Sequence, residues 1–345
     1  MRIALDAQLT VGSATGIGEY VRGLLPALRD AGIDAVALRE PALDPWRFDR
    51  RVLWDQVLLP ARASRCGASL LHCASGTVPL VRRLPVTVTV HDVAWLRVQA
   101  HARAYARYYF GGFSLARYRR CEAIITDSAF SRAELLDLLP HLEVARVHVV
   151  APGVAREFAE LQRGAGDRRT ILVVGTVEQR KNLGHVLRML RKLPHACLVS
   201  VGPPTPYIEK CRALAVELGV AERVEFRGYV SRAALLDLYA TAAVAAVPSL
   251  YEGFGYAVAQ ALCAGVPCVA SDRASLPEVA GGDARIVPLE DEEGWIAALA
   301  RALAGEEDAR ATQARARSSE RFSWTTAAAA MRAVYADVSG GSIDG

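Results

Sequence analysis

The chain has 345 residues, of which 52% are apolar and 23% are charged, and its formal net charge at pH 7 is +4. This length favours two domains over one, and the apolar fraction is sufficient for two hydrophobic cores. So mild a charge, without a module of interleaved basic and aromatic residues of the RNA-binding kind, argues against a nucleic-acid-binding protein.

The cysteines and the apolar segments indicate the cellular compartment. The seven cysteines show neither a C-x-x-C pair nor a histidine spacing suited to zinc, which is typical of reduced thiols. Residues 1–6 read as a short strand and not as a secretory signal peptide. The uncharged run 253–271 contains Gly265 and Pro267, which favour a helix, a turn and a strand over a membrane-spanning helix. We therefore expect a cytoplasmic protein.

Short apolar strands alternate with helices through the first half of the chain. Strands are predicted at residues 2–6, 33–38, 69–72, 86–91, 123–127 and 147–150. Helices are predicted after Gly18, through 102–120 and over 128–139. Buried strands separated by helices indicate an α/β domain with a parallel sheet that helices cover on both faces.

A polar, Gly-rich stretch between residues 151 and 169 separates this half from a second one with the same pattern. Strands are predicted there at 170–175, 197–202, 224–227, 244–248 and 267–270, with helices after Asn182, through 206–218, after Ser231 and after Gly255. Two Ala-rich helices are expected over 290–320, another helix over 324–338, and a flexible tail over 339–345. The prediction is two doubly wound domains, residues 1–155 and 165–322.

Ligands of open α/β sheets bind beyond the carboxyl ends of the strands, and charged residues follow one predicted strand of each half. Arg180 and Lys181 precede a helix that Asn182 can cap, an arrangement suited to a diphosphate, although a solvated basic turn is the alternative. His91 follows the strand 86–91, a position where a lone histidine is more often structural than catalytic. Asp92 either orients His91 or caps the next turn.

Two glycine-rich stretches open helices after strands. Gly16 and Gly18 open the first helix, but Val21 stands where a dinucleotide-binding fingerprint needs its third glycine.

Between residues 249 and 271, Gly253 and Gly255 allow close approach of the backbone to a ligand at a helix N-terminus. Glu252 stands before these glycines as an acceptor for hydroxyls. Gln260, four residues after Tyr256, can reach the same ligand.

This second stretch, from Ser249 to Ser271, resembles the Glu-x7-Glu signature of retaining glycosyltransferases of family four, which have the GT-B fold. It departs from the signature at Ala257, where proline is common, and at Gln260, where the second glutamate is expected. The resemblance implies two Rossmann-like, doubly wound α/β domains that face each other across a cleft. It also implies that the helix over 324–338 crosses back onto the first domain.

The resemblance further implies a metal-independent, retaining transferase that moves a hexose from a nucleotide-diphosphate sugar to a glycan or lipid-linked acceptor, without a cofactor. Arg180 and Lys181 would stabilise the departing diphosphate, Glu252 would hold sugar hydroxyls, and His91 would approach the sugar. Mannosyl or deoxyhexosyl transfer in the synthesis of a bacterial surface polysaccharide is the favoured reading. The remaining donor-binding residues that it implies are Gly16, Gly18, Tyr229, Gly253, Phe254, Gly255, Tyr256 and Gln260.

Two other functions stay open. A nucleotide-sugar epimerase with the GT-B fold shares the architecture, but it requires an acid/base set, whereas the Arg-Lys pair and the E-G-F-G run favour transfer. A catalytically degenerate nucleotide-binding subunit is the third reading, and Gln260 is the residue that favours it, because an amide accepts fewer hydrogen bonds from a ribose diol than a carboxylate does.

The segment 93–121 is basic and aromatic, with several arginines and no acidic residue. A helix of this composition suits the surface of an anionic membrane. A core helix with a solvated basic face accounts for it equally well. The first reading implies a lipid-linked acceptor and a peripheral position on the inner face of the plasma membrane.

Overall fold

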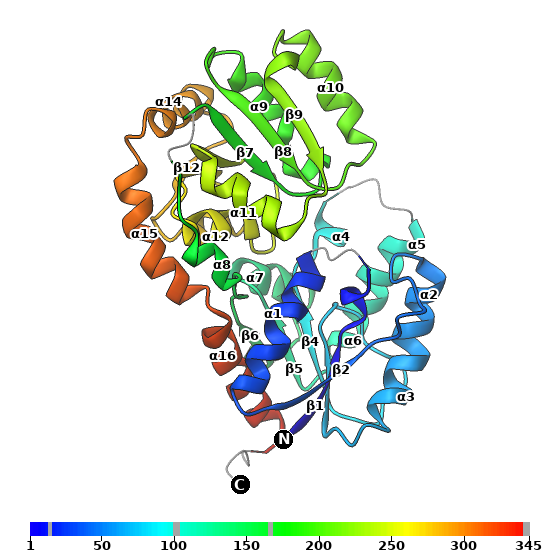
Figure 1. The fold of residues 1–345 in the computed structure, drawn as a ribbon. Helices are drawn as coiled ribbons and strands as arrows, with labels where there is room; N and C mark the ends of the chain where they lie inside the picture. The colour runs from blue at the N-terminus through cyan, green and yellow to red at the C-terminus, as the bar shows by residue number, and fades with distance from the viewer. Residues whose placement is uncertain (13–15, 99–103, 165–167, 341–345) are drawn as a thin grey trace. The chain divides into compact units, whose positions relative to one another are not determined.

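The computed structural model describes residues 1–12, 16–98, 104–164 and 168–340, and the chain divides into two compact units. Unit 1 comprises Met1–Gly153 with Ser323–Gly345, and unit 2 comprises Val154–Phe322 (Figure 1). Residues 156–164, which the sequence placed between the domains, include helix α8 (Arg156–Glu160) and belong to unit 2. Of the predicted tail, Ser339 and Gly340 form a turn and residues 341–345 lie outside the described residues.

Unit 1 is built on a parallel sheet with the strand order β2-β1-β3-β4-β5-β6. The strands are β1 (Arg2–Asp6), β2 (Asp34–Leu38), β3 (Leu70–Cys73), β4 (Val86–Val90), β5 (Ala123–Thr126) and β6 (Val147–Val149). The inner strands β3, β4 and β5 are buried at every position, as expected for a parallel sheet covered on both faces, although β4 alternates valine and threonine. Because all six strands are parallel, their carboxyl ends lie at one edge of the sheet.

Helices cover both faces of this sheet. One face packs against α1 (Gly16–Asp30) and α16 (Trp324–Val338), with Tyr20, Leu24 and Tyr335 in the core. The opposite face packs against Trp54, Leu59 and Tyr118. The helices and π-helices on and around that face are α2 (Phe48–Leu53), η2 (Trp54–Leu58), α3 (Leu59–Ala63), α4 (Ala94–Arg97), α5 (Ala104–Arg107), η3 (Tyr108–Phe113), α6 (Ser114–Tyr118) and α7 (Ala129–Leu138).

The helix predicted over 324–338 is α16, and it belongs to unit 1. Ser323 caps it, because the Ser323 hydroxyl accepts a hydrogen bond from the amide of Thr326 at 3.0 Å. Trp324 lies so close to Gly153 that a Cβ there would be 2.5 Å from the indole ring. The last helix is thus tied to unit 1 by a contact that only glycine permits.

The helix predicted over 102–120 is interrupted. Its described part consists of α5, the π-helix η3 and α6, and residues 99–103 lie outside the described residues. Gly111 and Gly112 lie within η3, and glycine weakens a regular helix, so the widened turn forms there. A second π-helix, η2, lies in the segment 48–63, for which the sequence predicted no element.

Unit 2 has a parallel sheet with the strand order β12-β11-β10-β7-β8-β9. Its strands are β7 (Thr170–Val174), β8 (Cys197–Val201), β9 (Val224–Gly228), β10 (Val244–Val247), β11 (Cys268–Ser271) and β12 (Arg285–Val287). Its longer helices are α9 (Leu183–Leu190), α10 (Tyr207–Glu217), α11 (Arg232–Thr241), α12 (Tyr256–Cys263), α14 (Glu292–Leu303) and α15 (Asp308–Arg321), and α13 (Leu276–Ala280) is a single short turn. The edge strand β12 was not predicted. One face of the sheet is covered by α9, α10 and α14 through Leu187, Cys211 and Trp295.

Among the described residues, no helix combines the length and the apolar character that crossing a membrane requires.

Candidate active site

The two cations predicted to bind phosphate lie beyond the end of β7, in the short 3-10 helix η5 (Gln179–Lys181). Asn182 follows with a left-handed backbone (φ 53°) and starts α9. The predicted side-chain cap is wrong, because the Asn182 amide instead donates to the Pro248 carbonyl at 3.1 Å. Asn182 therefore ties η5 to the end of β10, which brings the cations beside the loop that carries Glu252.

Glu252 lies between these two cations. Its Oε1 is 2.5 Å from Lys181 Nζ, and its Oε2 is 3.1 Å from Arg180 Nη1. The Ser249 hydroxyl donates to Oε1 at 2.7 Å. Arg180 also donates to the carbonyl of Tyr251 at 2.7 Å and pairs with Glu178 at 2.7 Å. The predicted catalytic residues of unit 2 thus form one network of charge-assisted hydrogen bonds.

The electrostatics of this network favour an ionised Glu252. Burial alone would raise the pKa of the Glu252 carboxyl, since its side chain is only 8% exposed, but Lys181 and Arg180 outweigh that effect and hold the pKa below its usual value. The cations themselves are about one-fifth exposed, at 21% and 20%. With Glu178 included, two carboxylates balance two cations at this edge of the sheet.

The loop that carries Glu252 is held by two hydroxyl groups, one at the end of β11 and one shortly after it. The Ser271 hydroxyl donates to the Ser249 carbonyl at 2.6 Å. The Ser275 hydroxyl is 2.9 Å from the carbonyls of both Glu252 and Phe254. Sequence analysis missed Ser275, although its place shortly after a strand was a usable signal. These contacts fix the backbone on both sides of Glu252.

Gly255 begins α12 in a left-handed conformation (φ 96°), and a Cβ there would be 2.6 Å from Leu276 Cδ2. A side chain at this position would be strained and would clash, so glycine is required. Phe254, which is buried, and Tyr256 pack edge to face with their ring centroids 5.4 Å apart. Gly253 precedes them in the same loop. The predicted donor-binding residues 253–256 therefore lie directly beside Glu252.

Gln260 lies on α12, where its Oε1 accepts a hydrogen bond from the Tyr239 hydroxyl at 3.2 Å. Tyr239 lies on α11, is fully buried and packs edge-on against Phe158. Sequence analysis missed Tyr239, because an aromatic residue in a helix gives the same signal as any core residue. Tyr229 follows β9, the edge strand two strands away from β7, and is 56% exposed.

In unit 1, His91 follows β4 and contacts two acceptors. Its Nδ1 is 2.7 Å from Asp127 Oδ2, and its Nε2 is 3.0 Å from the carbonyl oxygen of Ala74. The ring of Tyr20 packs against it edge-on at 4.8 Å. Asp92 caps the next turn by accepting from the Ala94 amide at 2.9 Å, so Asp127 and not Asp92 is the partner of His91.

Gly16 and Gly18 also lie in unit 1, and both are part of α1. Gly16 is its first residue and Gly18 is buried in its first turn. The predicted glycine-rich loop is therefore helical from Gly16 onward, and residues 13–15 lie outside the described residues.

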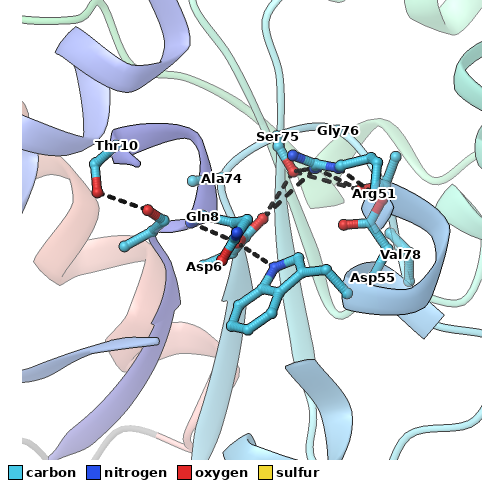
Figure 2. A network of polar contacts seen from close by, with 12 residues as sticks. Asp6, Gln8, Thr10, Arg51, Asp55, Ala74, Ser75, Gly76 and Val78 are labelled. Atoms are coloured by element: carbon cyan, nitrogen blue, oxygen red, sulfur yellow. Dashed lines mark hydrogen bonds and ion pairs between the residues drawn. The ribbon is translucent and has the colours of Figure 1, made fainter. Parts of the chain in front are cut away.

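A second polar cluster of unit 1, which sequence analysis did not single out, joins β1 to the π-helix η2 (Figure 2). Arg51 donates to Asp55 at 2.8 Å and lies 3.8 Å from Asp6, and all three side chains are at most 3% exposed. The Ser75 hydroxyl and the Trp54 indole N–H both donate to Asp6. Burial raises the pKa of Asp55 to about 6, where Arg51 opposes the rise and Asp6 adds to it.

Comparison with known proteins gives the family. The model "Glycosyltransferase Family 4" matches residues 14–158, and the model "Glycosyl transferases group 1" matches residues 168–305. A protein of Mycolicibacterium hassiacum, named MMP alpha-(1->4)-mannosyltransferase, is 32% identical over 287 residues, which cover 78% of this chain and 68% of that protein. The chain belongs to the group 1, family four glycosyltransferases.

Other members and solved structures agree with this assignment. The D-inositol 3-phosphate glycosyltransferase of Xylanimonas cellulosilytica is 34% identical over 61% of this chain, which spans 56% of that protein. Among solved structures, the sucrose-phosphate synthase of Thermosynechococcus elongatus matches with a TM-score of 0.74 at 23% identity, covering 99% of this chain and 100% of that one. Anabaena HepE in complex with UDP-glucose matches with a TM-score of 0.75 at 15% identity, covering 99% and 100%. The fold of this glycosyltransferase is therefore GT-B.

Proposed function

We propose that this glycosyltransferase transfers a hexosyl group from a nucleotide-diphosphate sugar, and that the donor diphosphate binds at Arg180 and Lys181. The observation that carries the proposal is the cluster in which Glu252 holds both cations at the carboxyl edge of the unit 2 sheet. That edge is where ligands of open α/β sheets bind. A solved protein of the same fold, HepE, contains UDP-glucose, which supports a donor of this class.

Binding of a diphosphate would require the cations to change partners. Lys181 is paired with Glu252, and Arg180 with Glu178 and Glu252, so phosphate oxygens would compete with these carboxylates. When Lys181 turns to phosphate, Oε1 of Glu252 becomes an acceptor for a sugar hydroxyl. After this exchange, Arg180 and Lys181 would stabilise the leaving group and Glu252 would position the sugar.

Retention of the anomeric configuration and independence from metal ions are further parts of the proposal. The two cations would neutralise the departing diphosphate without a divalent ion. In front-face transfer the leaving phosphate itself accepts the proton of the acceptor hydroxyl, so no protein nucleophile is needed. The name of the Mycolicibacterium hassiacum relative favours mannose as the transferred sugar.

A thermal-shift screen tests the donor assignment, because a ligand that binds the native state raises its melting temperature. Nucleoside diphosphates and their sugars would be compared with and without EDTA. We expect nucleotides of one base to raise the melting temperature, with or without EDTA. Arg180→Ala should abolish this shift. The control is Arg191→Ala, which changes an exposed arginine at the end of the neighbouring helix and should keep the shift. Absence of any nucleotide-dependent shift would contradict the proposal. An inverted product anomer, measured by proton NMR, would contradict retention alone.

We also propose that unit 1 contacts an anionic lipid surface and that the acceptor is lipid-linked. Within the segment 93–121, Arg97 is paired with Glu134 and Asp137, and Tyr109 and Tyr118 are buried. What supports the proposal is an open groove of about 540 Å³ next to exposed apolar side chains. Arg82, Arg117 and Arg120 line this groove together with Leu80, Val81 and neighbouring residues.

Leu80 and Val81 are 59% and 72% exposed, and together with the arginines they match a surface that offers both acyl chains and phosphates. Such a protein would lie on the inner face of the plasma membrane. Flotation should recover the wild type with phosphatidylglycerol vesicles but not with phosphatidylcholine vesicles. Arg120→Glu should lose this binding, and equal flotation with both lipids or with neither would contradict the lipid surface.

A further inference from the structure

The contacts of the His91 ring determine how many protons the ring and its partner hold. Nε2 lies 3.0 Å from the carbonyl oxygen of Ala74, which can only accept a hydrogen bond, so Nε2 carries a proton. Nδ1 lies 2.7 Å from Asp127 Oδ2, and a hydrogen bond there requires a second proton, either on the ring or on the carboxyl group. The pair therefore holds one proton more than a neutral histidine beside a carboxylate, and its total charge is zero.

The surroundings of the pair favour this extra proton. Burial would lower the pKa of His91, but the charge of Asp127 outweighs burial and raises it. Burial raises the pKa of Asp127, whose side chain is 3% exposed. The neighbouring groups are Tyr20, whose pKa burial raises, His72, whose pKa burial lowers to about 3, and Asp92. Tyr20 and His72 thus stay neutral, and Asp92 adds a nearby negative charge that favours the proton.

The acceptor on the other side of the ring is held in place by the buried cluster of unit 1. Ala74 begins the loop after β3, and the next residue, Ser75, donates to Asp6 at 2.8 Å and accepts from Arg51 (Figure 2). Arg51 also donates to Thr77 at 3.1 Å. The Ser131 hydroxyl fixes the backbone of His91 from α7 by donating to its carbonyl at 3.1 Å. The ring cannot turn without losing a hydrogen bond at each nitrogen.

We propose that Asp127 is a positioning residue that holds the His91 ring in this doubly protonated pair, so that both ring nitrogens keep a hydrogen-bond partner and the ring keeps one orientation at the carboxyl edge of the unit 1 sheet. The inference rests on the proposed function for its role in transfer, but not for the protonation of the pair. His91 is 17% exposed, so a charge on the pair is felt at the surface. Release of the proton would leave one net negative charge on the pair and would remove the hydrogen bond between Nδ1 of His91 and Asp127.

The protonation itself can be measured on the free protein by 15N NMR of the histidine side chains. His91→Gln assigns the His91 signals among those of the seven histidines. We expect the wild-type ring to remain doubly protonated above the ordinary midpoint of about 6.5. Asp127→Asn should return the ring to a neutral form at pH 7, whereas Asp92→Asn, the same change at the adjacent carboxylate that does not touch the ring, should keep it doubly protonated. A wild-type midpoint equal to that of Asp127→Asn overturns the proposal.

The consequence of this positioning for transfer is tested with UDP-glucose and GDP-mannose. Their diphosphates are diesters, which do not titrate between about pH 6 and 9. For the wild type we expect kcat/KM to fall at alkaline pH as the pair loses its proton. Asp127→Asn should remove this alkaline fall, because its ring is already neutral at pH 7 and has no further proton to lose, and it should lower kcat/KM about tenfold or more at pH 7 because the ring loses its charge-assisted partner. An alkaline limb that is identical in both proteins overturns the role in transfer. If neither sugar nucleotide is bound or used, the proposed function fails, and the NMR titration still decides the state of the pair.

Discussion

The two units each bury a charged cluster at the carboxyl edge of their sheet, but the clusters have opposite compositions. In unit 2, one carboxylate, Glu252, lies between two cations that are about one-fifth exposed. In unit 1, one guanidinium, Arg51, lies between two carboxylates, and all three groups are buried. Cations that reach the surface can exchange a carboxylate for a phosphate, whereas the buried cluster has no such exchange available. This difference in exposure is the reason why we propose a ligand site at the first cluster and a structural role for the second.

The two clusters also respond to pH in opposite ways. Lys181 and Arg180 lower the pKa of Glu252 despite its burial, so its contribution to stability is present above its ordinary pKa and is lost as the pH falls. Burial raises the pKa of Asp55 to about 6, so the folded state binds a proton more tightly than the unfolded state. The contribution of Asp55 is therefore present at low pH and is lost as the pH rises toward 6.

The largest expected effect is the loss of the guanidinium from the buried cluster. Arg51→Met leaves Asp6 and Asp55 without their cation, and breaking a buried ion pair from one side costs about 3–5 kcal/mol. Chemical denaturation would show a much earlier transition. The control is Arg50→Met on the same helix, where Arg50 is 46% exposed and pairs with the exposed Asp49. Equal stability of the two variants would show that the buried cluster does not support the fold.

Glu252→Gln should affect transfer more than stability. The variant removes the charge that orients Arg180 and Lys181, so we expect kcat/KM to fall about 100-fold or more, in the range found when a preorganised charge is removed from an active site. Glu225→Gln, which affects an exposed pair with Arg227 in the same unit, serves as the control and should keep normal activity. A loss of stability with unchanged kcat/KM would instead make the Glu252 cluster a structural one like that of Arg51.

The pH dependence of stability gives a smaller and more specific effect. Because the folded pKa of Asp55 is about 6, its ionisation costs the folded state about 2 kcal/mol between pH 4 and pH 7. Asp55→Asn should reduce this decline, as measured by melting temperatures at several pH values across that range. A decline as steep in the variant as in the wild type would assign it to other groups.

The smallest expected effects concern Gln260. With Oε1 engaged by Tyr239, a carboxylate at this position would keep that contact and offer its second oxygen to a ribose diol, so Gln260→Glu should tighten nucleotide binding several-fold, equivalent to about 1 kcal/mol. Calorimetric titration with the nucleoside diphosphate selected by the thermal-shift screen measures this change. Tyr239→Phe in the Gln260→Glu background should weaken binding again, and an unchanged or weaker dissociation constant in Gln260→Glu itself would rule out a ribose contact.

Some features of this protein followed from the sequence because they depend on short stretches of chain. The alternating pattern predicted eleven of the twelve strands that the structure describes, and the one that was missed, β12, has only three residues. Arg180, Lys181 and Glu252 were predicted because they follow apolar strands within a few residues and lie in short stretches that resemble a family signature, and both signals are local. The parallel sheet then forces them to a common edge, so their proximity followed from topology without any knowledge of side-chain contacts.

Other features depend on contacts between positions that lie far apart in the chain, and these became visible in the folded molecule alone. Asp127 lies 36 positions after its partner His91 in the chain, and Arg51 lies 45 positions after Asp6. The residues around such a carboxylate in the sequence do not indicate which distant residue it pairs with. Whether a charged side chain binds a ligand or supports the core depends on its burial and on the ratio of opposite charges around it, and the packing of helices on the sheet sets both. The alternation of strands and helices and the charged residues at the strand ends could be predicted, because they depend on neighbouring residues in the chain. The pairing and burial of those charges could not, because they depend on how the helices pack on the sheet.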